Sequence, residues 1–165
     1  MYYQEIIEAL NKNNIRYVII GGLALVLHGV VRLTADLDLI VDFEEKNLKK
    51  LLKVLEQLNF KPQLPIDAKK LLEEKTRKKW EIEKNMKAFA FIHKKDDYKL
   101  IDIIINPPLS FNEVYKRKQV IQAQKTKINV ISFEDLITFK KQAARTQDLK
   151  DIEMLLELKK HEKKQ

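Results

Sequence analysis

The sequence contains no cysteine, and it has only three glycines, four prolines and one tryptophan. Without cysteine, neither disulfide bonds nor thiolate metal sites can form. The only histidines are His28, His93 and His161, so a zinc site is not expected. A chain of 165 residues, 45% of them hydrophobic, can bury a core without such cross-links, and we expect one compact unit.

Long hydrophobic runs are also absent. The longest apolar stretch, Tyr17 to Val31, contains His28 and falls short of the ~20 residues that a membrane-spanning helix needs. The first ten residues, MYYQEIIEAL, lack the basic and apolar regions of a signal peptide. We therefore predict a cytoplasmic protein with no membrane partner.

Positive charge is in excess, with a formal net charge of +8 at pH 7. It is concentrated in two stretches, one with Lys69, Lys70, Lys75, Arg77, Lys78 and Lys79, the other with Lys116, Arg117, Lys118, Lys125 and Lys127. Such clusters can hold phosphate groups with an affinity that falls as salt is added. Lysine-rich surfaces also simply favour solubility, so composition alone leaves nucleic-acid binding open.

Hydrophobic periodicity predicts both helices and strands. Helices are expected over residues 2–13, 21–27, 44–58 and about 67–84, then from Phe133, and finally from a cap at Thr146 with a stripe of Leu149, Ile152, Leu155 and Leu156. Strands are expected at residues 15–20, 36–42, 87–93, 98–106, 120–123 and 128–131. The order predicts an α+β fold, a mixed sheet with helices mainly on one face. Residues 1–106 would form its core and residues 107–165 an extension of short strands and two helices packed on that core.

Two acidic residues lie in the predicted strand at 36–42. Because side chains alternate along a strand, Asp36 and Asp38 share one face. A third acid, Asp102, lies among large aliphatic residues in KLIDIIIN. Unpaired carboxylates near a core are costly, so a cation is expected between them. Mg²⁺ prefers such oxygen ligands, and three carboxylates can hold two ions, with Mn²⁺ as a substitute.

A glycine pair precedes these acids. Gly21 and Gly22 connect a strand directly to a helix, where free backbone N–H groups and the helix dipole favour an anion. Glycine lets a phosphate approach closely. Thirteen residues, Leu23 to Ala35, separate the pair from Asp36, so a phosphate site and a metal site would adjoin.

This combination resembles the polymerase-β-like nucleotidyltransferase superfamily. The stretch GGLALVLHGVVRLTADLDLIV, residues 21–41, is similar to the stand-alone prokaryotic branch that includes AbiEii-type toxins. The stretch DLITFKKQAARTQDLKDIEML, residues 135–155, matches that branch's motif at Lys140, Arg145, Asp148 and Asp151. The resemblance implies that Asp36, Asp38 and Asp102 bind divalent metal and catalyse transfer, and that Gly21 and Gly22 hold a triphosphate.

Other residues have two interpretations. Arg32 and Thr34 contact phosphate or fix the loop before the acids. Lys140 and Arg145 reach the nucleotide, or Arg145 joins Asp148 and Asp151 in an ion network between the last helices. For His28, a role at a helix end is favoured over metal ligation. For Trp80 and Tyr98, packing is favoured over base stacking.

These observations predict an Mg²⁺-dependent enzyme that moves a nucleoside monophosphate from an NTP to a hydroxyl. The acceptor would be RNA, such as a tRNA end, or a protein, with a small molecule such as an aminoglycoside left open. The resemblance also implies a component of a toxin–antitoxin pair with a cognate partner. The alternatives are a catalytically silent antitoxin or regulatory module with this fold, and a basic RNA-binding domain.

Overall fold

The computed structural model describes residues 3–164. Seven strands form one mixed sheet in the order β3-β4-β5-β2-β1-β7-β6. The strands are β1 (Tyr17–Ile20), β2 (Leu37–Val41), β3 (Phe60–Pro62), β4 (Ala88–His93), β5 (Asp96–Ile104), β6 (Gln119–Ala123) and β7 (Thr126–Val130). The α+β class predicted from the sequence is confirmed, and β6 and β7 extend the same sheet through β1.

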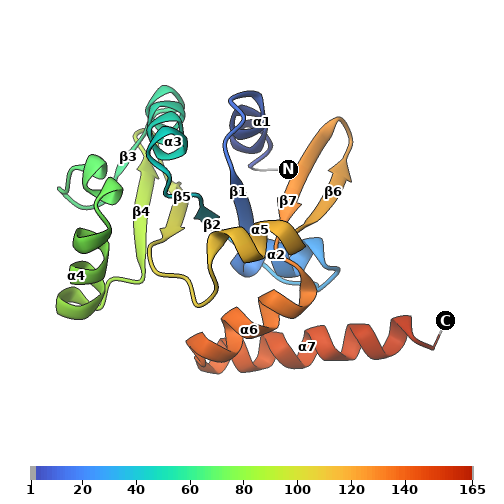
Figure 1. Ribbon diagram of the computed structural model, residues 1–165. Helices are drawn as coiled ribbons and strands as arrows, with labels where there is room; N and C mark the ends of the chain where they lie inside the picture. Colours follow the sequence, from blue (N-terminus) through green and yellow to red (C-terminus); the bar gives the residue numbers. More distant parts are fainter. Residues whose placement is uncertain (1–2, 165) are drawn as a thin grey trace.

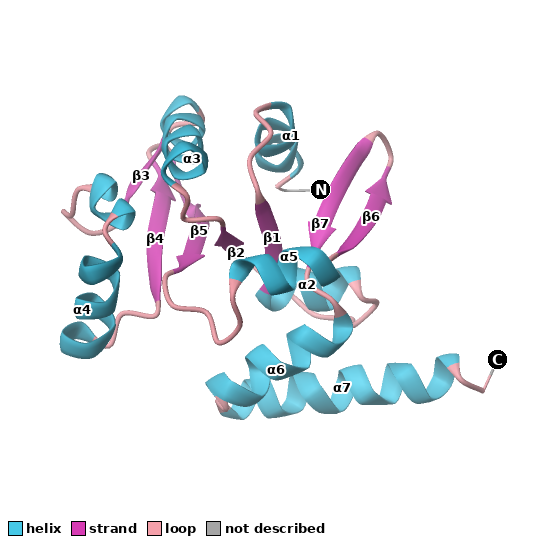
Figure 2. Cartoon of the chain, viewed as in Figure 1, coloured by secondary structure: helices cyan, strands magenta, loops and turns pink. Residues whose placement is uncertain are grey.

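Seven α-helices and one short 3₁₀ helix lie around the sheet (Figure 1). They are α1 (Gln4–Lys12), α2 (Gly21–Leu27), α3 (Glu45–Gln57), η1 (Ala68–Leu72), α4 (Glu74–Lys84), α5 (Phe111–Arg117), α6 (Phe133–Ala143) and α7 (Thr146–Glu162). Helices α1 and α3 lie above the strands in this view, whereas α6 and α7 lie side by side below them (Figure 2). Within residues 3–164, no helix is both long and apolar enough to cross a membrane.

The register of the central strands separates a hydrophobic side from an acidic side. Leu37 pairs with Ile101, which pairs with Phe91, and all three are buried. The neighbouring row, on the other face, contains Ile20, Asp38, Asp102 and Ala90. Because successive residues point to opposite faces, the acids project away from the core that Leu37, Ile101 and Phe91 form.

Most predicted elements are present, with corrections at three places. The helix expected at 67–84 is divided: Asp67 caps η1, and α4 begins only at Glu74. Strand β3 and helix α5 were not predicted. Helix α5 has a sequence signal, a capping box in which Ser110 and Glu113 bond each other's backbone N–H groups.

The prediction for the last helix was wrong about its N-cap and about two of the four residues of its buried stripe. Its N-cap is Arg145, one residue before Thr146. Leu149 and Leu156 are 53% and 44% exposed, whereas Ile152 and Leu155 are buried. The buried face instead includes two carboxylates, Asp148 and Asp151. Their ion pairs, which periodicity does not reveal, determine which face packs inward.

Candidate active site

Asp38 and Asp102 are direct neighbours on the parallel strands β2 and β5. In a parallel pair, residues in register share one face of the sheet, so their side chains project together. Asp36 immediately precedes β2, and its charge raises the pKa of both Asp38 and Asp102. The three acids predicted from the sequence therefore belong to one electrostatically coupled group.

The pKa of Asp38 reflects its burial and the repulsion between the three carboxylates. Burial, together with the charges of Asp102 and Asp36, raises the pKa of Asp38 to about 6. Burial and the charge of Asp36 also raise the pKa of Asp102 above its usual value. A hydrogen bond from the Gly22 N–H and the charge of Lys140 act in the opposite direction on Asp38. Like-charged carboxylates near a core destabilise each other, and a bound cation would relieve this repulsion.

The donor chemistry of the three acids fits a hard divalent cation such as Mg²⁺, which binds carboxylate oxygens. Within residues 3–164, however, no three His, Cys, Asp or Glu side chains are gathered into a preformed metal cluster. Asp38 and Asp102 are in register, and the charge of Asp36 couples it to both of them.

Gly21 is required at its position for two reasons. Its φ of +66° lies in the left-handed region that favours glycine. A Cβ built on Gly21 would lie 1.9 Å from Oδ2 of Asp38, so any side chain here would displace that carboxylate. Gly21 therefore makes room for Asp38 itself, a role that sequence analysis did not foresee beside phosphate binding.

Gly22 makes room for the loop that leads into β2. A Cβ on Gly22 would lie 2.6 Å from Oγ1 of Thr34. The Thr34 hydroxyl is 3.4 Å from the carbonyl oxygen of Asp36 and donates toward it. The glycine pair thus packs against Thr34 and Asp38 at the end of β1, and Thr34 contacts the backbone of Asp36.

A network of buried ions connects this loop to the last two helices. Lys140 of α6 donates to Asp148 at 3.2 Å and to Asp151 at 2.7 Å, both on α7. Arg32 pairs with the same Asp151 carboxylate, and the Gln147 amide donates to its other oxygen at 3.0 Å. The Lys140 and Asp151 side chains are 7% and 0% exposed. The contacts match the positioning interpretation of Arg32.

Arg145 differs from Lys140 in its exposure. Its Nε donates to Asp148 at 2.7 Å, but its side chain is 79% exposed. Its pKa is raised first by this hydrogen bond and, more weakly, by the charge of Asp38. The ion network between the last helices is therefore present, and the Arg145 guanidinium is both solvent-accessible and electrostatically linked to the acids.

Tyr3 is a further contact that the sequence did not reveal. Its side chain is buried, and its hydroxyl donates to the carbonyl oxygen of Ala35, the residue before Asp36. The same hydroxyl lies 3.5 Å from the Leu100 carbonyl on β5. Tyr3 is the N-cap residue of α1, and no local pattern in the sequence indicates its polar contact at the start of the acidic strand.

Of the remaining candidates, His28 and Trp80 have structural contacts, whereas the packing expected for Tyr98 is not observed. His28 caps α2, its Nε2 lies 2.8 Å from the Ile131 carbonyl, and its ring packs edge-on against Phe133. Trp80 is 6% exposed and packs against Phe89, with ring centroids 5.6 Å apart. Tyr98 is 85% exposed. The packing interpretations of His28 and Trp80 agree with these contacts.

The architecture is that of the nucleotidyltransferase fold. It is similar to the lincosamide antibiotic adenylyltransferase LnuA in its lincomycin-bound form, with a TM-score of 0.60, 19% identity and coverage of 92% of each chain. A putative nucleotidyltransferase from Thermotoga maritima gives a TM-score of 0.58 at 16% identity, over 94% of this chain and 91% of that one. ANT(2")-Ia in complex with adenylyl-2"-tobramycin gives 0.58 at 17% identity, over 96% and 87%.

The family model is more specific than these structural matches. Residues 2–159 match the family described as "Nucleotidyltransferase of unknown function (DUF6036)", and the chain belongs to this family. None of the curated proteins compared with the chain matches it. The predicted class of enzyme, a nucleotidyltransferase, is thus confirmed.

Proposed function

We propose that the protein transfers a nucleoside monophosphate from an NTP to a hydroxyl group, with release of pyrophosphate. One observation supports this above the others: Asp38 and Asp102 lie in register on the same sheet face, beside the glycine-lined start of α2. Their raised pKa values indicate acids held together despite repulsion, as expected of a functional site rather than a surface.

Asp36, Asp38 and Asp102 would hold divalent cations, two Mg²⁺ ions or Mn²⁺ in their place. Such ions neutralise phosphate charge and lower the pKa of an acceptor hydroxyl. The chain's own contribution is to keep the carboxylates on one rigid face, because β2 and β5 are hydrogen-bonded neighbours. Phosphoryl transfer of this type depends mainly on positioning and charge stabilisation, with no covalent protein intermediate.

The triphosphate would lie against Gly21 and Gly22 and extend toward Arg145. The exposed guanidinium of Arg145 can bind phosphate oxygens in a bidentate manner. Lys140 is buried between two carboxylates, so its contribution is to hold α6 and α7 together and to offset the charge of Asp38. Arg32 and Thr34 would fix the loop between the glycines and Asp36.

More than one class of acceptor hydroxyl is compatible with the proposal. The basic composition favours RNA such as a tRNA end, or a protein hydroxyl, and the resemblance to AbiEii-type proteins favours a toxin with a cognate antitoxin. Two structural neighbours, LnuA and ANT(2")-Ia, are named for antibiotics, which makes a small-molecule hydroxyl an alternative. A catalytically silent antitoxin or regulatory module is the other alternative.

A transfer assay tests the proposal. The protein is incubated with each α-labelled NTP, Mg²⁺ and cell lysate, separated afterwards into RNA, protein and small molecules. We expect label in one fraction with the wild type and none with Asp36→Asn/Asp38→Asn. The control is Asp97→Asn, an exposed acid on β5 outside the group, which should retain activity. Equal labelling by the double variant, or no labelling by any form, would contradict the proposal.

A further inference from the structure

The molecule has a hollow at the far end of β1 from the acids. It has a volume of about 890 Å³ and lies between α1, the start of β1, α5 and the β6–β7 hairpin. Residues that line it include Asn11, Arg16, Tyr115, Lys118, Lys125 and Lys127. We refer to it as the hairpin cavity. Its size suits a ligand or part of a chain rather than a single ion.

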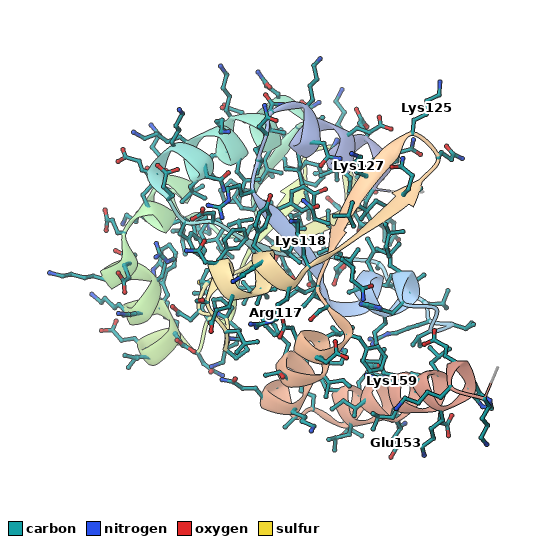
Figure 3. The ribbon with its side chains drawn as sticks, turned by 45° about the vertical axis from the view of Figure 1, so that its right-hand side comes forward. Arg117, Lys118, Lys125, Lys127, Glu153 and Lys159 are labelled. Atoms are coloured by element: carbon teal, nitrogen blue, oxygen red, sulfur yellow. The ribbon has the colours of Figure 1, made fainter. Side chains whose placement is uncertain are left out.

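Three of the four basic side chains that line the hairpin cavity have no carboxylate partner in the described chain, although Lys118 donates to the Tyr115 carbonyl at 3.4 Å. Within residues 3–164, Lys118, Lys125 and Lys127 form none of the ion pairs of the structure. Lys118 lies over the Tyr115 ring, with Nζ 3.8 Å from the centroid. Figure 3 shows Lys125 and Lys127 on the hairpin, with Lys118 below them near the start of β6.

Neighbouring cations are already neutralised, in contrast to these three. Arg117, next to Lys118, pairs with Asp135 at 3.0 Å, and Arg16, which lines the cavity, pairs with Asp42. Glu8 is the one acid among the described lining residues, and it accepts hydrogen bonds from Gln4 and Thr126. The three ammonium groups that have no carboxylate partner among residues 3–164 outnumber this single acid, so the concave surface has a local positive potential that attracts polyanions.

The position of the cavity separates it from the proposed nucleotide site. Arg16 lies at the start of β1 and Gly21 at its end, five residues apart, which is about 17 Å at ~3.3 Å per residue. A triphosphate held at Gly21 therefore leaves the hairpin cavity free. An anion that reaches both places must be a chain with several phosphates.

We propose that the hairpin cavity binds the phosphate backbone of a nucleic-acid strand that carries the acceptor hydroxyl. This inference rests on the proposed function and selects nucleic acid from its possible acceptors. Lys118, Lys125 and Lys127 contact phosphates, and the amide of Asn11 adds a neutral donor next to them. Contacts of this kind position a strand without reading its sequence.

RNA binding is measured under conditions that do not allow nucleotidyl transfer. The binding inference can therefore fail independently of the proposed function. Anisotropy of a fluorescein-labelled 12-nucleotide RNA is measured with the full chain in EDTA, without NTP. Three phosphate contacts on a single strand predict a roughly 20-fold loss of affinity from 50 to 200 mM salt. Lys118→Glu/Lys125→Glu/Lys127→Glu should weaken binding at least tenfold and flatten this salt dependence.

The matched control changes net charge equally on another surface. Lys75→Glu/Lys79→Glu/Lys84→Glu alters three exposed lysines of α4 and should change affinity less than threefold. If circular dichroism shows that the cavity variant with three glutamates does not fold, the milder Lys118→Gln/Lys125→Gln/Lys127→Gln is used in its place. A DNA strand of the same sequence shows whether the cavity prefers RNA or DNA. Binding of either strand supports the inference if it depends on the three lysines.

Three binding results would overturn the inference. The first is an equal loss of affinity in the cavity variant and the control, which would leave only net charge as the cause. The second is wild-type affinity in the cavity variant. The third is displacement of the RNA by micromolar ATP, which would place the nucleotide in the cavity. Retained RNA binding by Asp36→Asn/Asp38→Asn without transfer supports both proposals, whereas transfer to RNA that is unchanged in the cavity variant contradicts this inference alone.

Discussion

Asp38 and Asp102 are paired in register across β2 and β5, and each carboxylate is half-buried on the face opposite the hydrophobic core. The pairing is fixed by the backbone, since Leu37 pairs with Ile101 and Leu39 with Ile103 on the buried face. A shift of one residue would exchange apolar and acidic faces and expose those four side chains. The core therefore holds the two carboxylates together against their repulsion.

Replacement of Asp38 should stabilise the metal-free protein at neutral pH. The folded-state pKa of about 6 lies above the usual value of 3.8, so stability from this group is greatest below pH 4 and is lost as pH rises through 6. Asp38→Asn removes this penalty, which is at most about 3 kcal/mol. Urea unfolding in EDTA should show the variant more stable than wild type at pH 7.5 and nearly equal at pH 4. A variant less stable at pH 7.5 would contradict this account.

The two glycines should respond differently to substitution. Gly22→Ala would clash with the Thr34 hydroxyl, so Thr34→Ala should restore part of the lost stability in the double variant. Gly21→Ala should lose roughly 2 kcal/mol or more, because of its positive φ and its contact with Asp38, and Thr34→Ala should not rescue it. Urea unfolding of the three single variants and the two double variants measures both couplings. Equal rescue of both glycine variants would refute the proposed contacts.

Two substitutions in the ion network should have different effects, one mainly on stability and the other mainly on activity. Asp151→Ala leaves Lys140 buried with one partner and releases Arg32, so unfolding free energy should fall by about 3 kcal/mol. Arg145→Ala should cost about 1 kcal/mol or less, since its side chain is mainly exposed, but should raise the KM for NTP. Chemical denaturation and transfer kinetics distinguish the two. The reverse order of stabilities would show that Arg145 is the structural member.

Tyr3→Phe tests whether α1 positions the acidic strand. The substitution leaves the Ala35 carbonyl without this donor, at a cost of about 1–2 kcal/mol. Because Ala35 precedes Asp36, kcat should fall while the KM for NTP changes little. Tyr98→Phe, at an exposed position on β5, serves as the control and should alter neither value. Loss of stability with unchanged kcat would limit Tyr3 to a structural role.

Local signals in the sequence predicted much of the central sheet. Strand β2 and helix α3 have clear periodicities, and α6 begins at Phe133 as expected, with Ser132 as its N-cap. The relation between Asp38 and Asp102 follows from a parallel pairing between distant segments, which the superfamily resemblance implied but spacing alone does not determine. The acids were identified by their unusual place among aliphatic residues.

What the sequence did not predict depends on long-range polar contacts. Burial of Asp148 and Asp151 beside Ile152 and Leu155 shifts the buried face of α7 away from Leu149 and Leu156, because Lys140 and Arg32 compensate the charge of the two carboxylates. Strand β3 has three residues, too few for a periodic pattern. The close approach of Asp38 to Gly21 likewise requires coordinates, since the two residues lie on different elements.

Calorimetric titration of Mn²⁺ tests the central claim, that Asp38 and Asp102 form a divalent-cation site beside the glycines. At pH 7.5, wild type should bind Mn²⁺, and Asp102→Asn or Asp38→Asn should lower the affinity at least tenfold, whereas Asp97→Asn should match wild type. Mn²⁺ bound with equal affinity by all four proteins would contradict the account, because the acids would then take no part in the site.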